Sequence, residues 1–355
     1  MKSLNELREK SVQLKSENPK LRNRSLANQL GISEAELLTL NNPHVDVIVL
    51  DGDWRELLKE IHTMGYVMAL TRNESCVHER KGVYNNISFY GGEGNMGVAV
   101  NEDIDLRFFM NQWVHGLAVI MRRGKMADLY SFQFFNKEGE AVHKIFSTPD
   151  SDLDAYNSLV KKYIAHDQNP LVIEQIDEIN LEDSADETSD VDIEAFQNDW
   201  KNLQDTHDFF GMLKKYELNR TRAVRIAPEG MTEKVDKDAV VRMLELAAER
   251  KVPIMCFVHS KGCVQIHSGP VKNLKVFGDW YNVLDSKFNL HLKTNDISET
   301  WIVKKPTKDG IVTSLELFDE EGQLITYFFG KRKPGIPELE SWRKLMAEIS
   351  RASVK

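Results

Sequence analysis

The chain has 355 residues, an ordinary globular composition and a formal net charge of −9 at pH 7. This length exceeds the size at which one hydrophobic core usually keeps growing, so two domains are expected. The acidic balance argues against a nucleic-acid partner, because phosphate binding needs a concentrated basic surface. The apolar runs are too short to cross a bilayer, and the N-terminus lacks the apolar core of a signal peptide. We therefore expect a cytoplasmic protein without stable membrane insertion.

Residues 1–42 are expected to form a helical cap on the first sheet. Within them, SLANQLGISEAELLTL (25–40) has the spacing of a helix-turn-helix. A helix that reads DNA needs basic residues, and SEAELLTL has none. The favoured interpretation is an ordinary helical hairpin, and a DNA-binding regulator is kept as a remote alternative.

Two pairs of segments indicate an internal repeat. GDWRELLKEIHTMGYVMALTRNE (52–74) and NDWKNLQDTHDFFGMLKKYELNR (198–220) share Asp-Trp and a later glycine at the same spacing, and each predicts a helix with an acidic N-cap. SFQFFNKEGEAVHKIF (131–146) aligns without gaps with SLELFDEEGQLITYFF (314–329). Both alternate apolar and polar residues around Glu-Gly, which is typical of a β-hairpin.

Short β-rich segments fill the rest of each half, and Gly, Asn, Asp and Pro turns separate them at hairpin distances. The pattern predicts an α+β fold of two tandem repeats, each a large antiparallel sheet with helices at one side. A ligand cleft is expected between or beside the repeats.

The charge pattern predicts where the two repeats are joined. Residues 163–200 contain no Lys or Arg but many acids, a composition that favours a linker over a packed core. We predict an N-terminal repeat over 1–165, an acidic linker over 166–197 and a C-terminal repeat over 198–355 that carries the ligand.

Common catalytic motifs are missing from the sequence. It has no HExxH, HxH, GxSxG or Walker sequence, and its three scattered cysteines form no CxxC pair. A zinc enzyme, a hydrolase and a nucleotide enzyme therefore have no support at the level of residues.

One histidine in the second half has an unusual setting. A helix capped by Asp199 would carry one stripe of four side chains, Trp200, Leu203, His207 and Phe210. The gapless alignment places Ile61 opposite His207, although a shift of one residue would pair it with His62 instead. Asp205 and Asp208 lie close by, either to tune the imidazole or as solvated residues. A buried structural histidine and an axial ligand to a metal or haem iron both explain the pattern.

A haem would need aromatic walls, cations for its propionates and a group on the opposite face of the iron. The second half offers cationic and aromatic candidates, namely Arg220, Phe257, Lys305, Tyr327, Phe329 and Arg332. In the first half, Arg107 interrupts the apolar run between Leu106 and Phe108, where an inward arginine would need a partner. Solvated strand ends explain Lys305 and Arg332 equally well.

Several segments together resemble the HemS/ChuS/PhuS-type cytoplasmic hemin transport and degradation proteins of bacterial haem uptake systems. The segments are ALTRNESCVHERKGVYNNISF, NEDIDLRFF, DTHDFFGML, ELNRTRAVRIA, WIVKKPTKDGIV and YFFGKRKPGIPE. The likeness spans nearly the whole chain, in the same order and including the duplication.

The resemblance implies a haem b site on the C-terminal half, closed by the N-terminal half. It implies that His207 is the axial ligand of the haem iron and that Arg107 is a catalytic residue covering the other face. The resemblance also assigns the propionate-binding cations to Arg220, Lys305 and Arg332 and an aromatic wall to Phe257. Tyr327 and Phe329 stay further candidates for haem binding. Some family members have extra histidines directly after the ligand, whereas this chain has Asp208, Phe209 and Phe210, so ligand switching is not expected.

The implied function is to accept imported haem for iron acquisition, by trafficking, by oxidative degradation or by both. A pure haem carrier or store and a haem oxygenase-like enzyme remain alternatives, because both need the same pocket. The implied partners are haem, an inner-membrane haem ABC transporter, and a haem oxygenase or a reductase.

Overall fold

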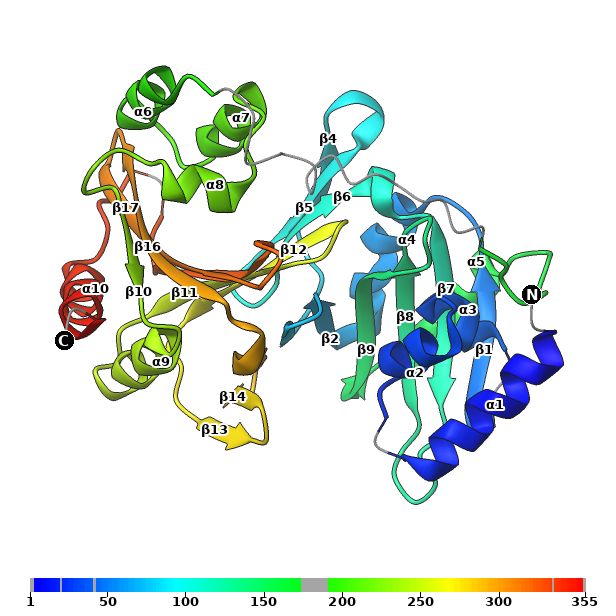
Figure 1. Ribbon diagram of the computed structural model, residues 1–355. Coiled ribbons are helices and arrows are strands. Elements are labelled where there is room, and N and C mark those ends of the chain that lie inside the picture. Colours follow the sequence, from blue (N-terminus) through cyan, green and yellow to red (C-terminus); the bar gives the residue numbers. More distant parts are fainter. Residues whose placement is uncertain (1–2, 20, 41–42, 174–190, 334, 354–355) are drawn as a thin grey trace. The chain divides into compact units, whose positions relative to one another are not determined.

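The computed structural model describes residues 3–19, 21–40, 43–173, 191–333 and 335–353. Within them, antiparallel strands form two nine-stranded sheets with flanking helices, so the α+β prediction is confirmed (Figure 1). The strand orders are β1-β7-β8-β9-β2-β3-β15-β14-β13 and β10-β16-β17-β18-β11-β12-β6-β5-β4. None of the helices in this part of the chain is long and apolar enough to span a membrane.

The chain divides into two compact units. Unit 1 comprises Met1–Arg72, Glu79–Ile176 and His259–Gln265, and unit 2 comprises Asn73–His78, Asp177–Val258 and Ile266–Lys355. The units therefore exchange short pieces of chain, which the simple division into 1–165 and 198–355 does not include. The centre of the predicted acidic linker, residues 174–190, lies outside the described residues.

The elements recur in the same order, which confirms the internal repeat. The first repeat consists of β1 (Val45–Leu50), α4 (Trp54–Glu60), β2 (Gly65–Arg72), β3 (Cys76–Gly82), β4 (Ile87–Tyr90), β5 (Met96–Val100), β6 (Asp105–Phe109), β7 (His115–Met121), β8 (Leu129–Phe135), β9 (Ala141–Ser151) and α5 (Leu153–Tyr163). The second repeat consists of β10 (Thr232–Val235), α9 (Ala239–Glu249), β11 (Ile254–His259), β12 (Cys263–Gly269), β13 (Leu274–Phe277), β14 (Trp280–Leu284), β15 (Phe288–Lys293), β16 (Glu299–Thr307), β17 (Gly310–Phe318), β18 (Leu324–Gly330) and α10 (Glu340–Ser353).

Among the described residues, three helices precede each repeat. They are α1 (Leu4–Glu17), α2 (Asn23–Leu30) and α3 (Glu34–Thr39) before the first, and α6 (Ile193–Lys201), α7 (Asp208–Lys215) and α8 (Arg220–Arg225) before the second. In Figure 1 the latter three lie together beside one end of β16 and β17.

The N-terminal helices cap a sheet, as expected for an ordinary helical hairpin. Every residue of α3 except Glu36 is buried, and its Ala35 and Leu38 pack with residues of β7 and β8. The buried Glu34 forms ion pairs with Arg72 on β2 and Lys144 on β9. A recognition helix must present an exposed polar face to DNA, so α3 does not favour the DNA-binding alternative.

Both predicted hairpins are present. Strands β8 and β9 pair with register Gln133↔Lys144, and β17 and β18 pair with register Glu316↔Tyr327. Each turn contains a glycine with positive φ, 74° at Gly139 and 79° at Gly322, which other residues adopt only with strain.

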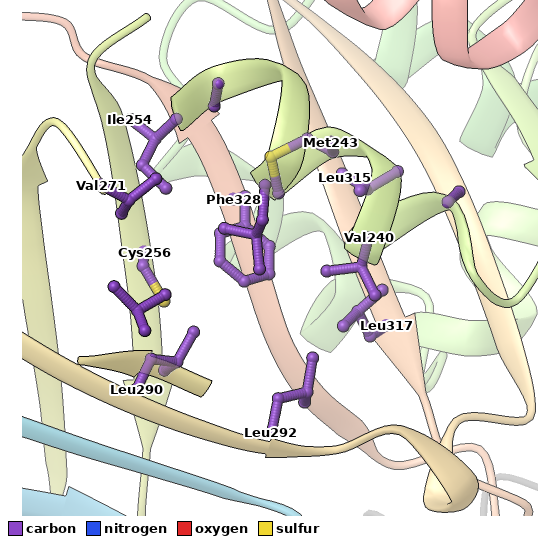
Figure 2. Packing of buried hydrophobic residues seen from close by; sticks show 14 of the residues in the cluster. Val240, Met243, Ile254, Cys256, Val271, Leu290, Leu292, Leu315, Leu317 and Phe328 are labelled. Carbon is purple, nitrogen blue, oxygen red and sulfur yellow. The ribbon is translucent and has the colours of Figure 1, made fainter. Parts of the chain in front are cut away.

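The core of unit 2 covers one face of its sheet. In Figure 2, Val240 and Met243 of α9 pack over Leu315 and Leu317 of β17 and Phe328 of β18. Because successive side chains of a strand point to opposite faces, the neighbours of Phe328 on β18 lie on the other face. That second face carries most of the predicted haem residues.

Candidate functional site

The helix expected around His207 is wrong in its bounds. Helix α6 is capped by Asp192 rather than Asp199 and ends at Lys201, and α7 begins only at Asp208, so His207 stands immediately before α7. The stripe of four side chains does not exist, because Trp200 is buried while Phe210 is 70% exposed. The gapless pairing with Ile61 is also wrong, since Ile61 follows α4 and the second-repeat counterpart of α4 is α9.

His207 is an exposed residue held by an aspartate. Its side chain is 91% exposed, and its Nδ1 lies 2.6 Å from Oδ1 of Asp205. The same oxygen accepts the backbone N–H of His207 at 2.9 Å, and this turn interrupts the helix. The interpretation as an ordinary buried histidine is therefore wrong. With Nδ1 engaged by a carboxylate, Nε2 is the nitrogen left to bind a metal, which is the arrangement usual for ligating histidines.

The charge of Asp205 is maintained by its surroundings. Its pKa is lowered, first by the hydrogen bond from the backbone N–H of His207 and further by the imidazole and the nearby charge of Arg332. The partner of His207 is therefore a carboxylate at neutral pH.

Two of the predicted cations meet on one buried carboxylate, that of Glu316. Arg220 donates from Nε to Oε2 at 2.7 Å and from Nη2 to Oε1 at 2.9 Å, and Lys305 donates from Nζ to Oε1 at 2.8 Å. The hydroxyl of Ser314 donates to Oε1 at 2.7 Å. Lys305 is buried rather than a solvated strand end, so that alternative is wrong for this residue.

The three charges change one another's protonation. Burial alone would raise the pKa of Glu316, but the charges of Arg220 and Lys305 hold it well below its usual range. Burial lowers the pKa of Lys305 to about 8, although Glu316 opposes this effect. The pKa of Arg220 is raised despite burial, because Glu316 faces it. With one carboxylate between two cations, the cluster keeps a net positive charge at neutral pH.

Phe209 connects this cluster to the segment that carries His207. Its ring centroid lies 4.4 Å from Nζ of Lys305 and 5.4 Å from Cζ of Arg220. Because Phe209 is buried in the first turn of α7, directly after His207 and Asp208, it fixes the start of that helix beside the two cations.

Aromatic side chains of β11 and β18 form a partly exposed platform. Phe257 and Tyr327 are cross-strand partners whose rings stack with a centroid distance of 4.8 Å and an interplanar angle of 15°. Phe329 meets both rings edge-on, and Arg220 lies over the Tyr327 ring at 5.0 Å. The platform thus adjoins the cationic cluster, as a flat ligand with acidic groups requires.

Arg332 follows the same strand β18. Its Nε is buried and has no hydrogen-bond partner among the described residues, while its charge acts on Asp205. A buried donor of this kind fits an anionic group supplied by a ligand.

Arg107 lies in unit 1, on β6. It forms an ion pair with Asp105, two residues earlier on the same face of the strand, and both side chains are partly exposed. Burial raises the pKa of Asp105, and Arg107 opposes that effect. Its role on the opposite face of a haem stays a prediction.

Unit 2 therefore brings together the predicted residues Arg220, Phe257, Lys305, Tyr327 and Phe329. Glu316 and Phe209 also belong to this cluster, although the sequence patterns did not identify them as site residues. The signal for Glu316 was present, because it is a single acid at an inward position of the strand SLELF, where a charged group needs a partner.

Known proteins match this chain over nearly its whole length. The model of a family described as "Haemin-degrading HemS.ChuX domain" matches residues 31–163 and again residues 217–349. The hemin transport protein HemS of Yersinia enterocolitica is 36% identical over 349 residues, 98% of each chain. The crystal structure of holo-PhuS, a heme-binding protein from Pseudomonas aeruginosa, is 42% identical with a TM-score of 0.90, covering 98% of this chain and 99% of that one. The heme degrading enzyme ChuS of Escherichia coli O157:H7 is 32% identical with a TM-score of 0.89 over the same shares.

Proposed function

Because the chain belongs to the family of the haemin-degrading HemS.ChuX domain, we propose that it is a cytoplasmic haem-binding protein that accepts imported haem for iron acquisition. Its relatives include a hemin transport protein, a heme-binding protein and a heme degrading enzyme. The proposed ligand is haem b, delivered by an inner-membrane haem ABC transporter and handed on to a haem oxygenase or used with a reductase.

The observation that carries this proposal is the His207–Asp205 pair. An exposed imidazole whose Nδ1 faces a carboxylate at 2.6 Å has its Nε2 available as the axial ligand of haem iron. The carboxylate fixes the orientation of the ring and increases the basicity of the ligating nitrogen.

The surrounding residues fit the other parts of the haem. Arg220, Lys305 and Arg332 supply cations for the propionates, and the unpartnered Nε of Arg332 fits such a carboxylate. Phe257, Tyr327 and Phe329 supply aromatic surface for the macrocycle. We assign Arg107 to the opposite face of the iron, as the resemblance to the family implies.

Titration of the protein with hemin tests the ligand assignment. The wild type is expected to give a Soret band that saturates at one equivalent, and His207→Ala should weaken binding and shift the band. The variant His62→Ala is a matched control, because His62 is an exposed histidine of unit 1. An unchanged spectrum and affinity in His207→Ala would exclude His207 as the axial ligand.

Whether the bound haem is carried or degraded is tested with the loaded protein. The haem complex is reduced without oxygen, oxygen is then added, and the products are analysed. Release of stoichiometric iron together with a linear tetrapyrrole identifies an enzyme. Intact haem that transfers to an acceptor protein identifies a carrier.

A further inference from the structure

The buried carboxylate of Glu316 has no part in the function proposed so far. We propose that Glu316 is a positioning residue that holds Arg220 and Lys305 in place to receive the carboxylates of the ligand. This inference rests on the proposed haem-binding function and adds to it a residue that acts through the two cations.

The geometry places the carboxylate behind the guanidinium of Arg220 and beside the buried ammonium of Lys305. Glu316 is fully buried, whereas the side chain of Arg220 is 24% exposed, so the cationic side of the pair faces outward. Three donors converge on Oε1, those of Arg220, Lys305 and Ser314, and Nε of Arg220 occupies Oε2. The bidentate contact fixes the plane of the guanidinium, and the shared oxygen fixes the ammonium beside it. Neither cation needs to be ordered again when a ligand arrives.

The equivalent strands of the first repeat, β7 and β8, carry uncharged residues at the positions of Lys305 and Glu316. Gln133 occupies the position of Glu316 in the gapless hairpin alignment, and its Nε2 donates to Oγ of Ser131 at 3.0 Å. The register pairs Leu117 with Gln133 and Trp301 with Glu316, so Met121 stands where Lys305 stands in the second repeat. Acid and ammonium thus occur together in one repeat and are both replaced by uncharged residues in the other. The fold does not need the acid at this position.

The proposal is tested with Glu316→Gln, the residue that the first repeat already tolerates. Hemin affinity is measured between pH 6 and 9 for the wild type and the variant. At pH 8 the variant should bind hemin on the order of tenfold more weakly, the effect of losing one charge-assisted contact. Its affinity should also begin to fall at a lower pH than that of the wild type.

The direction of this pH effect follows from the groups that surround Lys305. Lys305 lies on β16, and three side chains from other elements face it. They are Glu316 of β17, Arg220 of α8 and the uncharged Phe209 of α7. Its pKa of about 8 already includes the opposing influence of Glu316, so removal of that carboxylate moves it lower. Lys305 then loses its charge, and its attraction for a propionate, at a lower pH.

Two further measurements separate positioning from mere stability. Hemin dimethyl ester, which lacks the free carboxylates, should bind equally well to the wild type and to Glu316→Gln. Glu316→Asp keeps the charge but is too short to hold both cations, so it should bind hemin more weakly with the pH onset of the wild type. Glu34→Gln is the matched control, because Glu34 is a buried acid between a lysine and an arginine in unit 1, and its hemin affinity should stay at the wild-type value.

The inference is overturned if Glu316→Gln keeps the wild-type affinity and pH onset, or if the dimethyl ester suffers the same loss as hemin. Should Glu316→Gln fail to fold, an unchanged hemin affinity in Glu316→Asp overturns it as well. A wild type that binds no hemin, or a His207→Ala variant that binds as the wild type does, contradicts the proposed function instead. The two failures are thereby distinguishable.

Discussion

Replacing Asp205 by asparagine tests the feature on which the proposed ligand depends. Asparagine is nearly the same size, and its carbonyl still accepts the backbone N–H of His207 that shapes the turn. What is lost is the negative charge opposite Nδ1, at the 2.6 Å contact. The substitution therefore changes the electronic character of the imidazole more than its position.

The expected magnitude follows from this contact. A charge-assisted hydrogen bond is about twice as strong as a neutral one, a difference of roughly 1 to 1.5 kcal/mol. Because the Asp205 side chain is 49% exposed, solvent screening favours the lower end of that range. Because ~1.4 kcal/mol corresponds to a tenfold change in an equilibrium constant, a loss of ~1 kcal/mol should lower hemin affinity about fivefold in Asp205→Asn.

Hemin titration followed in the Soret region measures this effect, with thermal unfolding as a check on folding. Asp208→Asn is a matched control, since Asp208 accepts the backbone N–H of Asp205, whereas the imidazole is hydrogen-bonded to Asp205. It should change hemin affinity less than Asp205→Asn does. Equal affinities in the wild type and Asp205→Asn, or an equal loss in both variants, would refute the role given to Asp205.

Two predictions concern the stability of unit 1. Tyr84→Phe removes the hydroxyl that lies 2.6 Å from Nε2 of His143, in a site where burial lowers the pKa of that imidazole to about 3. Urea unfolding at pH 7 should show a free energy of unfolding that is ~1 to 3 kcal/mol lower. An unchanged midpoint would contradict this. Burial of Glu34 raises its pKa, but the charges of Lys144 and Arg72 outweigh this effect and lower the pKa from 4.5 to about 2. The carboxylate therefore stabilises the fold above pH 4.5, and this contribution is lost as the pH falls towards 2. The difference in unfolding free energy between the wild type and Glu34→Gln should therefore shrink by ~3 kcal/mol over that range, and parallel pH profiles would exclude it.

The parts of the fold that could be predicted from sequence are those that neighbouring residues determine. Both hairpins follow from period-two alternation around a glycine that adopts positive φ, as at Gly139 and Gly322. The helix after Asp53 is also correct, because Asp53 accepts the backbone N–H of Arg55 as an N-cap should. In these cases the local preference and the tertiary structure agree.

The error at His207 has a local cause that a periodic pattern does not include. The spacing of apolar residues favoured one continuous helix, but the Asp205 side chain accepts a backbone N–H two residues on and forms a turn instead. The histidine was therefore expected on a buried stripe and is in fact exposed. Its role as a haem ligand was predicted from family resemblance and not from the helical pattern.

The Glu316 cluster could not be predicted from spacing, because its members are distant in the sequence. Arg220 and Glu316 are 96 residues apart, and Lys305 and Glu316 are 11 apart. Each appeared in the sequence as a single charged residue with several possible environments. Only the pairing of β16 with β17, and the helices that cover them, places the three groups together.

The two repeats share the same strand pairing but carry different side chains on the equivalent face of the sheet. At the position where the first repeat pairs Leu70 with Lys144, the second pairs Phe257 with Tyr327. Lys144 is held by Glu34 of α3, so that helix is fastened to its sheet by buried charge. In the second repeat the corresponding charges lie between strands and α8, and the aromatic pair beside them stays partly exposed. The backbone pairing is the same in both repeats, so a few side chains and the preceding helices account for the difference. In the first repeat they cover the face of the sheet, and in the second they leave a face suited to a flat, anionic ligand.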